Sequence, residues 1–290
     1  MMLWPAVWGR RFRLPTVGQT LSSVNLDISA IYSQLLTVAA PIGAARVSKR
    51  SCGVTNPRSC ETTKSLTMSA LAIALSLALA GALAAQVAGQ ANSGYKTPQQ
   101  RQSVAAGLGS PERDATEKPG VLIREMMLQP GMTVADIGTG IGYMLPFLSR
   151  RVGTSGRVIA EDIYDDFLAA AKQRATNQKL QNVSFVKGTD TDCNLPEGQV
   201  DIVLALDVYH HFDYPEKMLA TIHKALRADG RLVIVEYYKR ESAMPNGKAL
   251  THIRLDMPDV IKEIEANHFH LIEEKEHIKD VQYMLILEKS

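Results

Sequence analysis

A glycine-rich segment with an acidic residue just before it has the spacing that most favours a ligand site. Gly138, Gly140 and Gly142 follow an apolar run, and Asp136 lies two positions before the first of them. Glycines between a strand and a helix permit a tight turn and a close ligand approach. The spacing is GxGxG rather than the GxGxxG of dinucleotide folds, and a carboxylate at Asp136 would repel a pyrophosphate. We therefore expect a cationic ligand, such as an amino acid ammonium, at this loop, which also contains Thr139.

Further acidic residues follow the next two apolar runs, at positions that suit contacts to a nucleoside. Asp162 ends the second run, about 20 residues beyond the loop, where a carboxylate can accept both ribose hydroxyls. Glu161 has the opposite parity along that strand, so Asp162 is the preferred candidate. Asp190 and Asp192 follow the third run, and either could accept a hydrogen bond from an adenine amino group.

Two adjacent histidines follow the fourth apolar run. His210 and His211 are candidate general bases because imidazole titrates near neutral pH, although either could simply cap the strand or contact a loop. Asp207, just before them, is a further candidate for cofactor contact, and His252 is a candidate for acceptor binding. No metal site is expected from the histidine pair, because adjacent residues of an extended segment point in opposite directions.

The elements that must position these residues alternate along the chain. Short apolar runs separated by amphipathic stretches predict a Rossmann-like, doubly wound α/β fold with a mostly parallel sheet. The two final strands are separated by a short polar segment, which suits a hairpin. The expected strands are 132–137, 157–162, 183–187, 200–206, 231–238, 269–273 and 282–287. The expected helices are 119–127, 143–152, one starting at 165, one from 215 that Asp229-Gly230 ends, and 258–266.

Four of these segments together resemble the class I S-adenosylmethionine-dependent methyltransferases. The segments VADIGTGIGY, GRVIAEDI, CNLPEGQVDIVLALDVYHHF and LRADGRLVIVEYY occur in the family's order, within a match from about Pro119 to Lys289. The resemblance implies a seven-stranded sheet with an antiparallel last strand and S-adenosylmethionine at the carboxyl ends of the early strands. It also implies methyl transfer by in-line displacement to an acceptor expected to be a small molecule. The family has no universal catalytic residue.

Charge is unevenly distributed along the chain. Residues 1–64 carry eight Lys and Arg against two Asp and Glu, whereas the whole chain has a net charge of only +2. The remainder is therefore mildly acidic and lacks the clustered cations that nucleic-acid binding requires. Three cysteines provide no even disulfide framework.

The first hundred residues predict a targeting segment rather than a catalytic domain. We expect a basic segment at 1–67 that is disordered or precedes a true start at Met68, an apolar signal peptide or membrane anchor at 68–91, a linker at 92–118 and a methyltransferase domain at 119–290. Residues 66–89 are also long enough to cross a bilayer, which allows membrane association. Export to the periplasm or anchoring in the inner membrane is the expected localisation. Organelle targeting, or a cytoplasmic protein with a mis-assigned start, is the alternative.

Two other functional classes remain as rivals at this stage. A non-catalytic exported binding protein would keep the fold without turnover, although the intact loop glycines argue against it. A nucleotide-dependent oxidoreductase would need the GxGxxG spacing, and Asp136 argues against that too. The sequence leaves the acceptor and the oligomeric state open.

Overall fold

The computed structural model describes residues 88–290 of the chain. The expected basic segment at 1–67 and nearly all of the apolar segment at 68–91 lie outside these residues. Within residues 88–290, no helix combines the length and the apolarity needed to span a bilayer.

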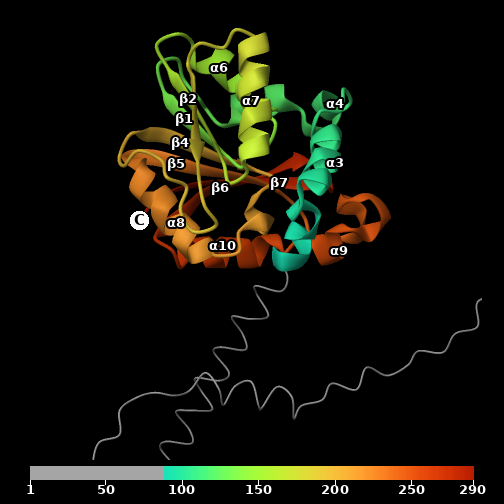
Figure 1. Ribbon diagram of the computed structural model, residues 1–290. Coiled ribbons are helices and arrows are strands. Elements are labelled where there is room, and N and C mark those ends of the chain that lie inside the picture. The colour runs from blue at the N-terminus through green and yellow to red at the C-terminus, as the bar shows by residue number, and fades with distance from the viewer. Residues whose placement is uncertain (1–87) are drawn as a thin grey trace, which may run out of the picture. The chain divides into compact units, whose positions relative to one another are not determined.

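A seven-stranded sheet forms the centre of the domain, with the strand order β3-β2-β1-β4-β5-β7-β6 (Figure 1). Strands β1 to β5 pair in parallel, and β7 is antiparallel to both β5 and β6, which confirms the predicted fold class. The order reverses between β1 and β4, where open α/β sheets bind ligands at the carboxyl ends of the strands. The strands are β1 (Thr133–Ile137), β2 (Arg157–Asp162), β3 (Val183–Lys187), β4 (Val200–Leu206), β5 (Leu226–Tyr237), β6 (Phe269–Ile278) and β7 (Gln282–Lys289).

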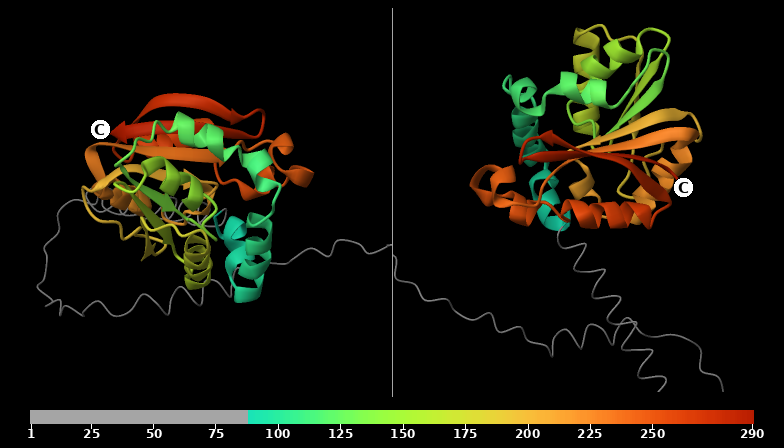
Figure 2. Two further views of the ribbon diagram at one scale, coloured as in Figure 1. Left: turned by 90° about the horizontal axis from the view of Figure 1, so that it is seen from above. Right: turned by 180° about the vertical axis from the view of Figure 1, so that it is seen from behind.

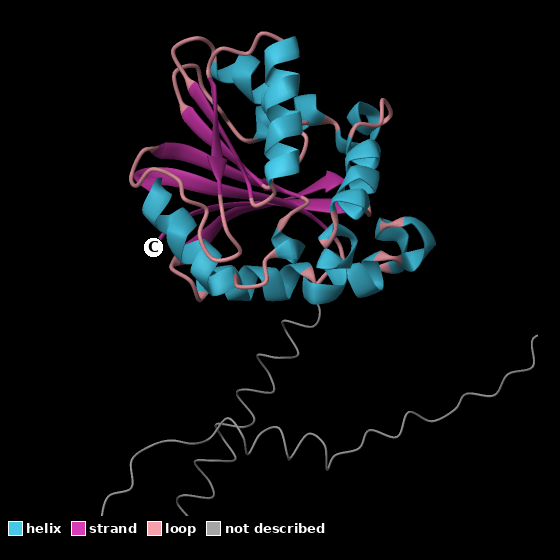
Figure 3. Cartoon of the chain, viewed as in Figure 1, coloured by secondary structure: helices cyan, strands magenta, loops and turns pink. Residues whose placement is uncertain are grey.

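Helices cover both faces of the sheet (Figure 3). Alternate residues of β1 and β4 point to opposite faces, so Ala135 and Val203 belong to one apolar cluster and Val134 and Leu204 to the other. The first cluster includes residues of α8 (Pro215–Ala225) and α10 (Met257–Glu265). The second includes residues of α5 (Pro119–Glu125), α6 (Leu145–Val152) and α7 (Asp165–Asn177). Burial on both faces explains why these strands are almost wholly apolar.

Residues 92–118 correct the sequence prediction of a linker, because most of them are helical. They form η1 (Asn92–Tyr95), α3 (Pro98–Leu108) and α4 (Arg113–Glu117), which lie at one side of the sheet (Figure 2). A capping box starts α3, since Thr97 and Gln100 exchange side-chain and backbone hydrogen bonds. Arg101 then fixes α3 to α7 through two hydrogen bonds to Asp166, at 2.9 and 2.7 Å. Helix α3 buries none of its residues fully, so its sequence lacks the apolar periodicity that predicts a helix.

Several element boundaries differ from the sequence prediction, three of them for a structural reason. Helix α6 begins at Leu145 rather than at Tyr143, because residues 138–144 form the turns of the glycine loop. Helix α8 ends at Ala225, and Leu226 already pairs with Val200 in the sheet, which lengthens β5 at its start. Strand β6 continues to Ile278 because it pairs with β7 along its whole length, and its alternating exposed residues face solvent.

Candidate active site

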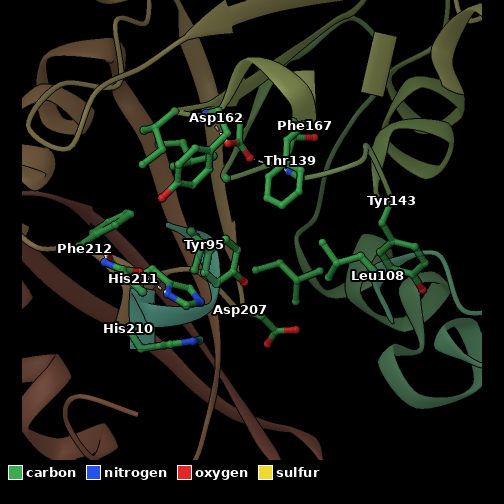
Figure 4. Close-up of a pocket in the computed structure, with 18 of the residues that line it drawn as sticks. Tyr95, Leu108, Thr139, Tyr143, Asp162, Phe167, Asp207, His210, His211 and Phe212 are labelled. Atoms are coloured by element: carbon green, nitrogen blue, oxygen red, sulfur yellow. Dashed lines mark hydrogen bonds between the residues drawn. The ribbon is translucent and has the colours of Figure 1, made fainter. Parts of the chain in front are cut away.

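A cavity of about 740 Å³ lies at the carboxyl ends of β1, β2 and β4 (Figure 4). Its walls come from the loop after β1, the end of β2, the loops after β3 to β5, and the helices η1, α3 and α4. The volume falls in the range of about 300–1,000 Å³ that small-molecule and cofactor sites occupy. Because β1 and β4 are the strands between which the order reverses, the cavity lies where a doubly wound fold binds its ligand.

The glycine loop leaves no space for side chains at two positions on the cavity wall. Gly138 has a φ of +62°, and a Cβ there would lie 2.4 Å from the Val208 side chain. Gly140 has a φ of +55°, and a Cβ there would approach Leu108 of α3 to 3.1 Å. Both conformations are left-handed and favour glycine. The backbone thus forms a cradle that any side chain would fill.

Gly142, the third glycine of the loop, is not among the residues that line the cavity. It also has a left-handed φ, of +76°, but a Cβ there would meet Leu145 at 2.7 Å and Ala171 at 3.1 Å. The third glycine of the loop therefore permits close packing of α6 and α7 behind the site.

Asp136 and Thr139 lie together at the bottom of the loop and both line the cavity. The Thr139 hydroxyl donates a hydrogen bond of 2.7 Å to an Asp136 carboxylate oxygen. Burial raises the pKa of Asp136 to about 7. A nearby positive charge would favour the ionised carboxylate and offset that burial. The environment of Asp136 therefore suits a cationic ligand.

Asp162 ends β2 and accepts two backbone hydrogen bonds, from the amides of Gly140 and Tyr164, both at 2.9 Å. Burial raises its pKa to about 6. Its neighbour Glu161 also lines the cavity and accepts a hydrogen bond of 3.2 Å from the Gly138 amide. Glu161 fits there because Gly188 has no Cβ, which would otherwise lie 1.8 Å from the carboxylate. Strand parity alone did not indicate that both acids border the site.

Only one of the two acids proposed for the adenine lines the cavity. Asp190 is part of the wall, together with Thr189. Asp192 is not, because its carboxylate accepts a 2.8 Å hydrogen bond from the Asn194 amide and its carbonyl accepts one from the Thr189 amide. Asp192 therefore shapes the turn that presents Asp190, and its assignment as a cofactor contact is corrected.

Asp207 follows β4 with a left-handed φ of +53° and lines the cavity, as predicted. Its carboxylate accepts a 2.8 Å hydrogen bond from Gln282 of β7, which donates another of 3.0 Å to Glu117. The Arg113 guanidinium lies 4.0 Å from each of these carboxylates. Burial and the Glu117 charge nevertheless raise the pKa of Asp207. Arg113 and Glu117 belong to α4 and had no signal in the sequence.

His210 is oriented by a buried carboxylate. Its Nδ1 lies 2.6 Å from Glu236 Oε2, and its backbone amide donates to the same oxygen at 3.1 Å. Glu236 is 1% exposed and His210 is 3% exposed. His210 Nε2 is buried and has no hydrogen-bond partner among the described residues. Glu236 thus leaves one imidazole nitrogen available at the cavity wall, and nothing in its strand-like sequence context indicated this role.

The two adjacent histidines point the same way, contrary to the prediction for an extended segment. Tyr209–His211 forms a 3-10 turn, η2, so the rings of His210 and His211 lie 4.1 Å apart (Figure 4). His252, at the end of α9 (Ala249–His252), brings a third ring to within 4.8 Å of His210. Burial lowers the pKa of His211 well below its usual value and that of His252 to about 4. Both rings are therefore neutral at pH 7.

The N-terminal segment closes this end of the cavity. Asn92 contacts His211 twice: its Oδ1 lies 2.7 Å from Nδ1, and its amide donates to the His211 carbonyl at 3.1 Å. Tyr95 meets the His211 ring edge-on at 4.9 Å and stacks on Tyr164 at 6.1 Å. Both residues of η1 lie in the range predicted to be a linker, so the sequence did not indicate either contact.

Comparisons with known proteins agree with this geometry. Residues 135–234 match a family described as "Methyltransferase domain". A protein named "Ubiquinone/menaquinone biosynthesis C-methyltransferase UbiE" from Marinomonas sp. (strain MWYL1) is 30% identical over 123 residues, which cover 42% of this chain and 49% of that protein. A protein of the same name from Enterobacter sp. (strain 638) is 29% identical over 110 residues, which cover 38% of this chain and 44% of that protein. The chain thus spans less than half the length of these relatives.

A solved structure is similar over most of the described domain. The crystal structure of a SAM-dependent methyltransferase from Aquifex aeolicus has a TM-score of 0.59 and 25% identity, and the match covers 64% of this chain and 96% of that one. The glycine cradle, the carboxylate at the end of β2 and the sheet order occur together with this likeness. Residues 135–234 therefore match a methyltransferase domain, and the fold is similar to that of a SAM-dependent methyltransferase, which implies S-adenosylmethionine as the cofactor.

Proposed function

We propose that this protein transfers a methyl group from S-adenosylmethionine to a small, ring-bearing acceptor with an ionisable hydroxyl, and that His210 accepts the hydroxyl proton. One observation carries this proposal: His210 lines the cavity, its buried Nε2 has no hydrogen-bond partner among the described residues, and Glu236 holds Nδ1 at 2.6 Å. A carboxylate in that position fixes the tautomer and stabilises the imidazolium that forms.

The cofactor fits the other end of the cavity. Gly138 and Gly140 provide the cradle that a Cβ would fill, and we assign the ribose hydroxyls to Asp162, which lines the same cavity. We assign the adenine amino group to Asp190 and the cationic part of the cofactor to Asp136. When bound, the cofactor supplies an electrophilic methyl group on a sulfonium.

The acceptor class is suggested by the lining of the histidine end and by the relatives. Tyr95 and Phe212 provide aromatic surface beside His210 and His211. Flat rings stack on such surface. The similar proteins from Marinomonas and Enterobacter are named as C-methyltransferases of quinone biosynthesis. Their names support a ring-bearing acceptor here.

Proton transfer and positioning would provide the catalysis. The acceptor hydroxyl gives its proton to His210 Nε2, which increases the nucleophilicity of the oxygen and of the ring carbons conjugated to it. The nucleophilic atom would form a bond to the methyl carbon while the carbon–sulfur bond breaks. The electron pair of the broken bond would stay on sulfur, which leaves as a neutral thioether. If a ring carbon attacks, its hydrogen leaves as a proton afterwards. A general base contributes roughly 10²- to 10⁴-fold, and near-attack positioning about 7–11 kcal/mol.

Titration calorimetry of the full chain tests the cofactor first. S-Adenosylmethionine and S-adenosylhomocysteine should bind with micromolar dissociation constants and NAD should not. Methyl transfer is then measured by mass spectrometry on hydroxylated aromatic and quinol acceptors, with matched acceptors whose hydroxyl is replaced by hydrogen. Turnover that needs the hydroxyl supports the proposal. Cofactor binding without turnover of any acceptor would favour a non-catalytic binding protein, and equal turnover of both acceptor sets would eliminate the role of His210 as a base.

A further inference from the structure

Three imidazoles converge at the acceptor end of the cavity. One ring nitrogen from each of His210, His211 and His252 lies within 4.8 Å of the other two. Two of the rings come from η2, after β4, and the third from α9, after β5. A single general base explains one of these side chains and leaves two without a chemical role.

Two of the rings have a hydrogen-bond acceptor at Nδ1, as histidine ligands of metal ions usually do. Glu236 holds His210 through Nδ1, and the side-chain oxygen of Asn92 lies 2.7 Å from His211 Nδ1. In each case the oxygen accepts a hydrogen from Nδ1, so the lone pair is on Nε2. Histidine ligands usually donate their second nitrogen to a carboxylate or carbonyl oxygen in this way. His210 Nε2 is in addition buried and without a partner among the described residues.

We propose that His210, His211 and His252 bind a divalent transition metal ion of the zinc class, with the fourth coordination position open to the cavity. Three protein ligands and one open position are the arrangement of exchangeable zinc sites, and imidazole suits zinc, copper, iron and nickel. Nitrogen ligands at about 2.0–2.1 Å from a tetrahedral ion lie about 3.4 Å apart. Small rotations of side chains that now lie within 4.8 Å close the site.

Charges around the cluster favour a cation on balance. Glu236 is buried against His210, and the carboxylate of Asp213 lines the same cavity. Lys248 lines the cavity too, with the opposite charge. It is exposed, so its flexible side chain can turn to solvent when a cation binds.

Metal binding and proton transfer through His210 use the same nitrogen. A bound ion therefore blocks His210 as a base, and the metal-loaded protein should be inhibited until a chelator removes the ion. Metal binding is measured without any acceptor, so this inference and the proposed methyl transfer can fail separately.

The test uses full-length protein without a polyhistidine tag, treated with chelator and then titrated with Co²⁺ and, by calorimetry, with Zn²⁺. We expect one equivalent of each metal to bind and Co²⁺ to show the intense visible absorption of a tetrahedral complex. Variants His211→Ala and His252→Ala should each weaken Zn²⁺ binding on the order of 100-fold or more, and Glu236→Gln about 10- to 100-fold.

His270→Ala is the matched control, because His270 is an exposed histidine of β6 outside the cluster. It should bind Zn²⁺ like the unaltered protein. S-Adenosylmethionine affinity, measured for every variant, reports that the domain is folded. The inference is overturned if folded His252→Ala binds Zn²⁺ unchanged, if His270→Ala loses as much affinity, or if Co²⁺ shows no tetrahedral spectrum.

Discussion

The two ends of the cavity are built in different ways. At the cofactor end, two backbone amides of one loop donate to the last two residues of the neighbouring strand, Gly138 to Glu161 and Gly140 to Asp162. At the acceptor end, side chains from three distant segments meet: Asn92 contacts His211 across 119 positions of sequence, and His252 completes the group. The first end is therefore fixed by strand register, and the second by tertiary packing.

Because of this difference, the two ends tolerate amino-acid substitutions to different degrees. Backbone groups and left-handed glycines allow few substitutions, so the cofactor end keeps a short, readable pattern. Side chains contributed by separate elements can change one at a time, so we expect the individual substrate to depend on the acceptor end. Perturbations at one end should consequently leave the ligand of the other largely unaffected.

The largest expected effect is on turnover, from a change at the acceptor end. His210→Gln keeps a hydrogen-bond donor for Glu236 but removes the base, so methyl transfer by chelator-treated protein should fall roughly 10²- to 10⁴-fold. S-Adenosylmethionine affinity should stay unchanged in calorimetry, and His270→Ala should keep full turnover. A parallel loss of cofactor affinity would show that the two ends are not independent.

Gly140→Asp should have the next largest effect, on cofactor affinity. A side chain there adopts a φ of +55° beside Leu108 and adds a charge next to Asp162, so binding should weaken on the order of 10- to 100-fold. Gly120→Asp adds the same charge at an exposed position where a Cβ meets nothing within 4 Å. Calorimetry that finds equal affinities for the two variants would remove the cofactor from this loop.

The pH dependence of cofactor binding should be smaller. Burial raises the pKa of Asp136 to about 7, so in the ligand-free protein the carboxyl is largely neutral below that pH and ionises as the pH rises. A cation that binds the ionised form only should gain about tenfold in affinity between pH 6 and pH 8. Asp136→Asn should flatten this dependence in calorimetry, and an equal slope in the variant would assign it to another group.

The smallest expected effect comes from the N-terminal wall. Asn92→Ala removes hydrogen bonds to His211 and Asp213, which should raise the KM for the acceptor about 5- to 10-fold with the cofactor dissociation constant unchanged. Asn177→Ala, an exposed asparagine of α7, should leave both constants alone. Steady-state kinetics with no change in KM would make the Asn92 contact irrelevant to the acceptor.

The same contrast explains which features the sequence revealed. The strands β2 and β4 begin and end where their apolar runs predicted, because burial on both faces requires an unbroken run. The edge strand β3 also has the predicted bounds, although its residues are only partly buried or exposed. Asp136, Asp162 and the glycine cradle were recognisable from local spacing. Asn92, Tyr95 and Arg113 were missed because η1 and α4, which contain them, are short and carry no apolar stripe. The shared direction of His210 and His211 depended on a 3-10 turn that the apolar pattern could not predict.

The wall formed by residues 92–117 lies wholly before residues 135–234, the part that matches the family pattern. A truncated protein that contained only residues 135–234 would keep the glycine loop but would lack Asn92, Tyr95 and Arg113. Because residues 92–117 precede the sheet in the chain, they can be exchanged as one continuous segment. If the proposed acceptor site is correct, we expect exchange of this segment with that of a related protein to change the acceptor preference and leave the sheet unaltered.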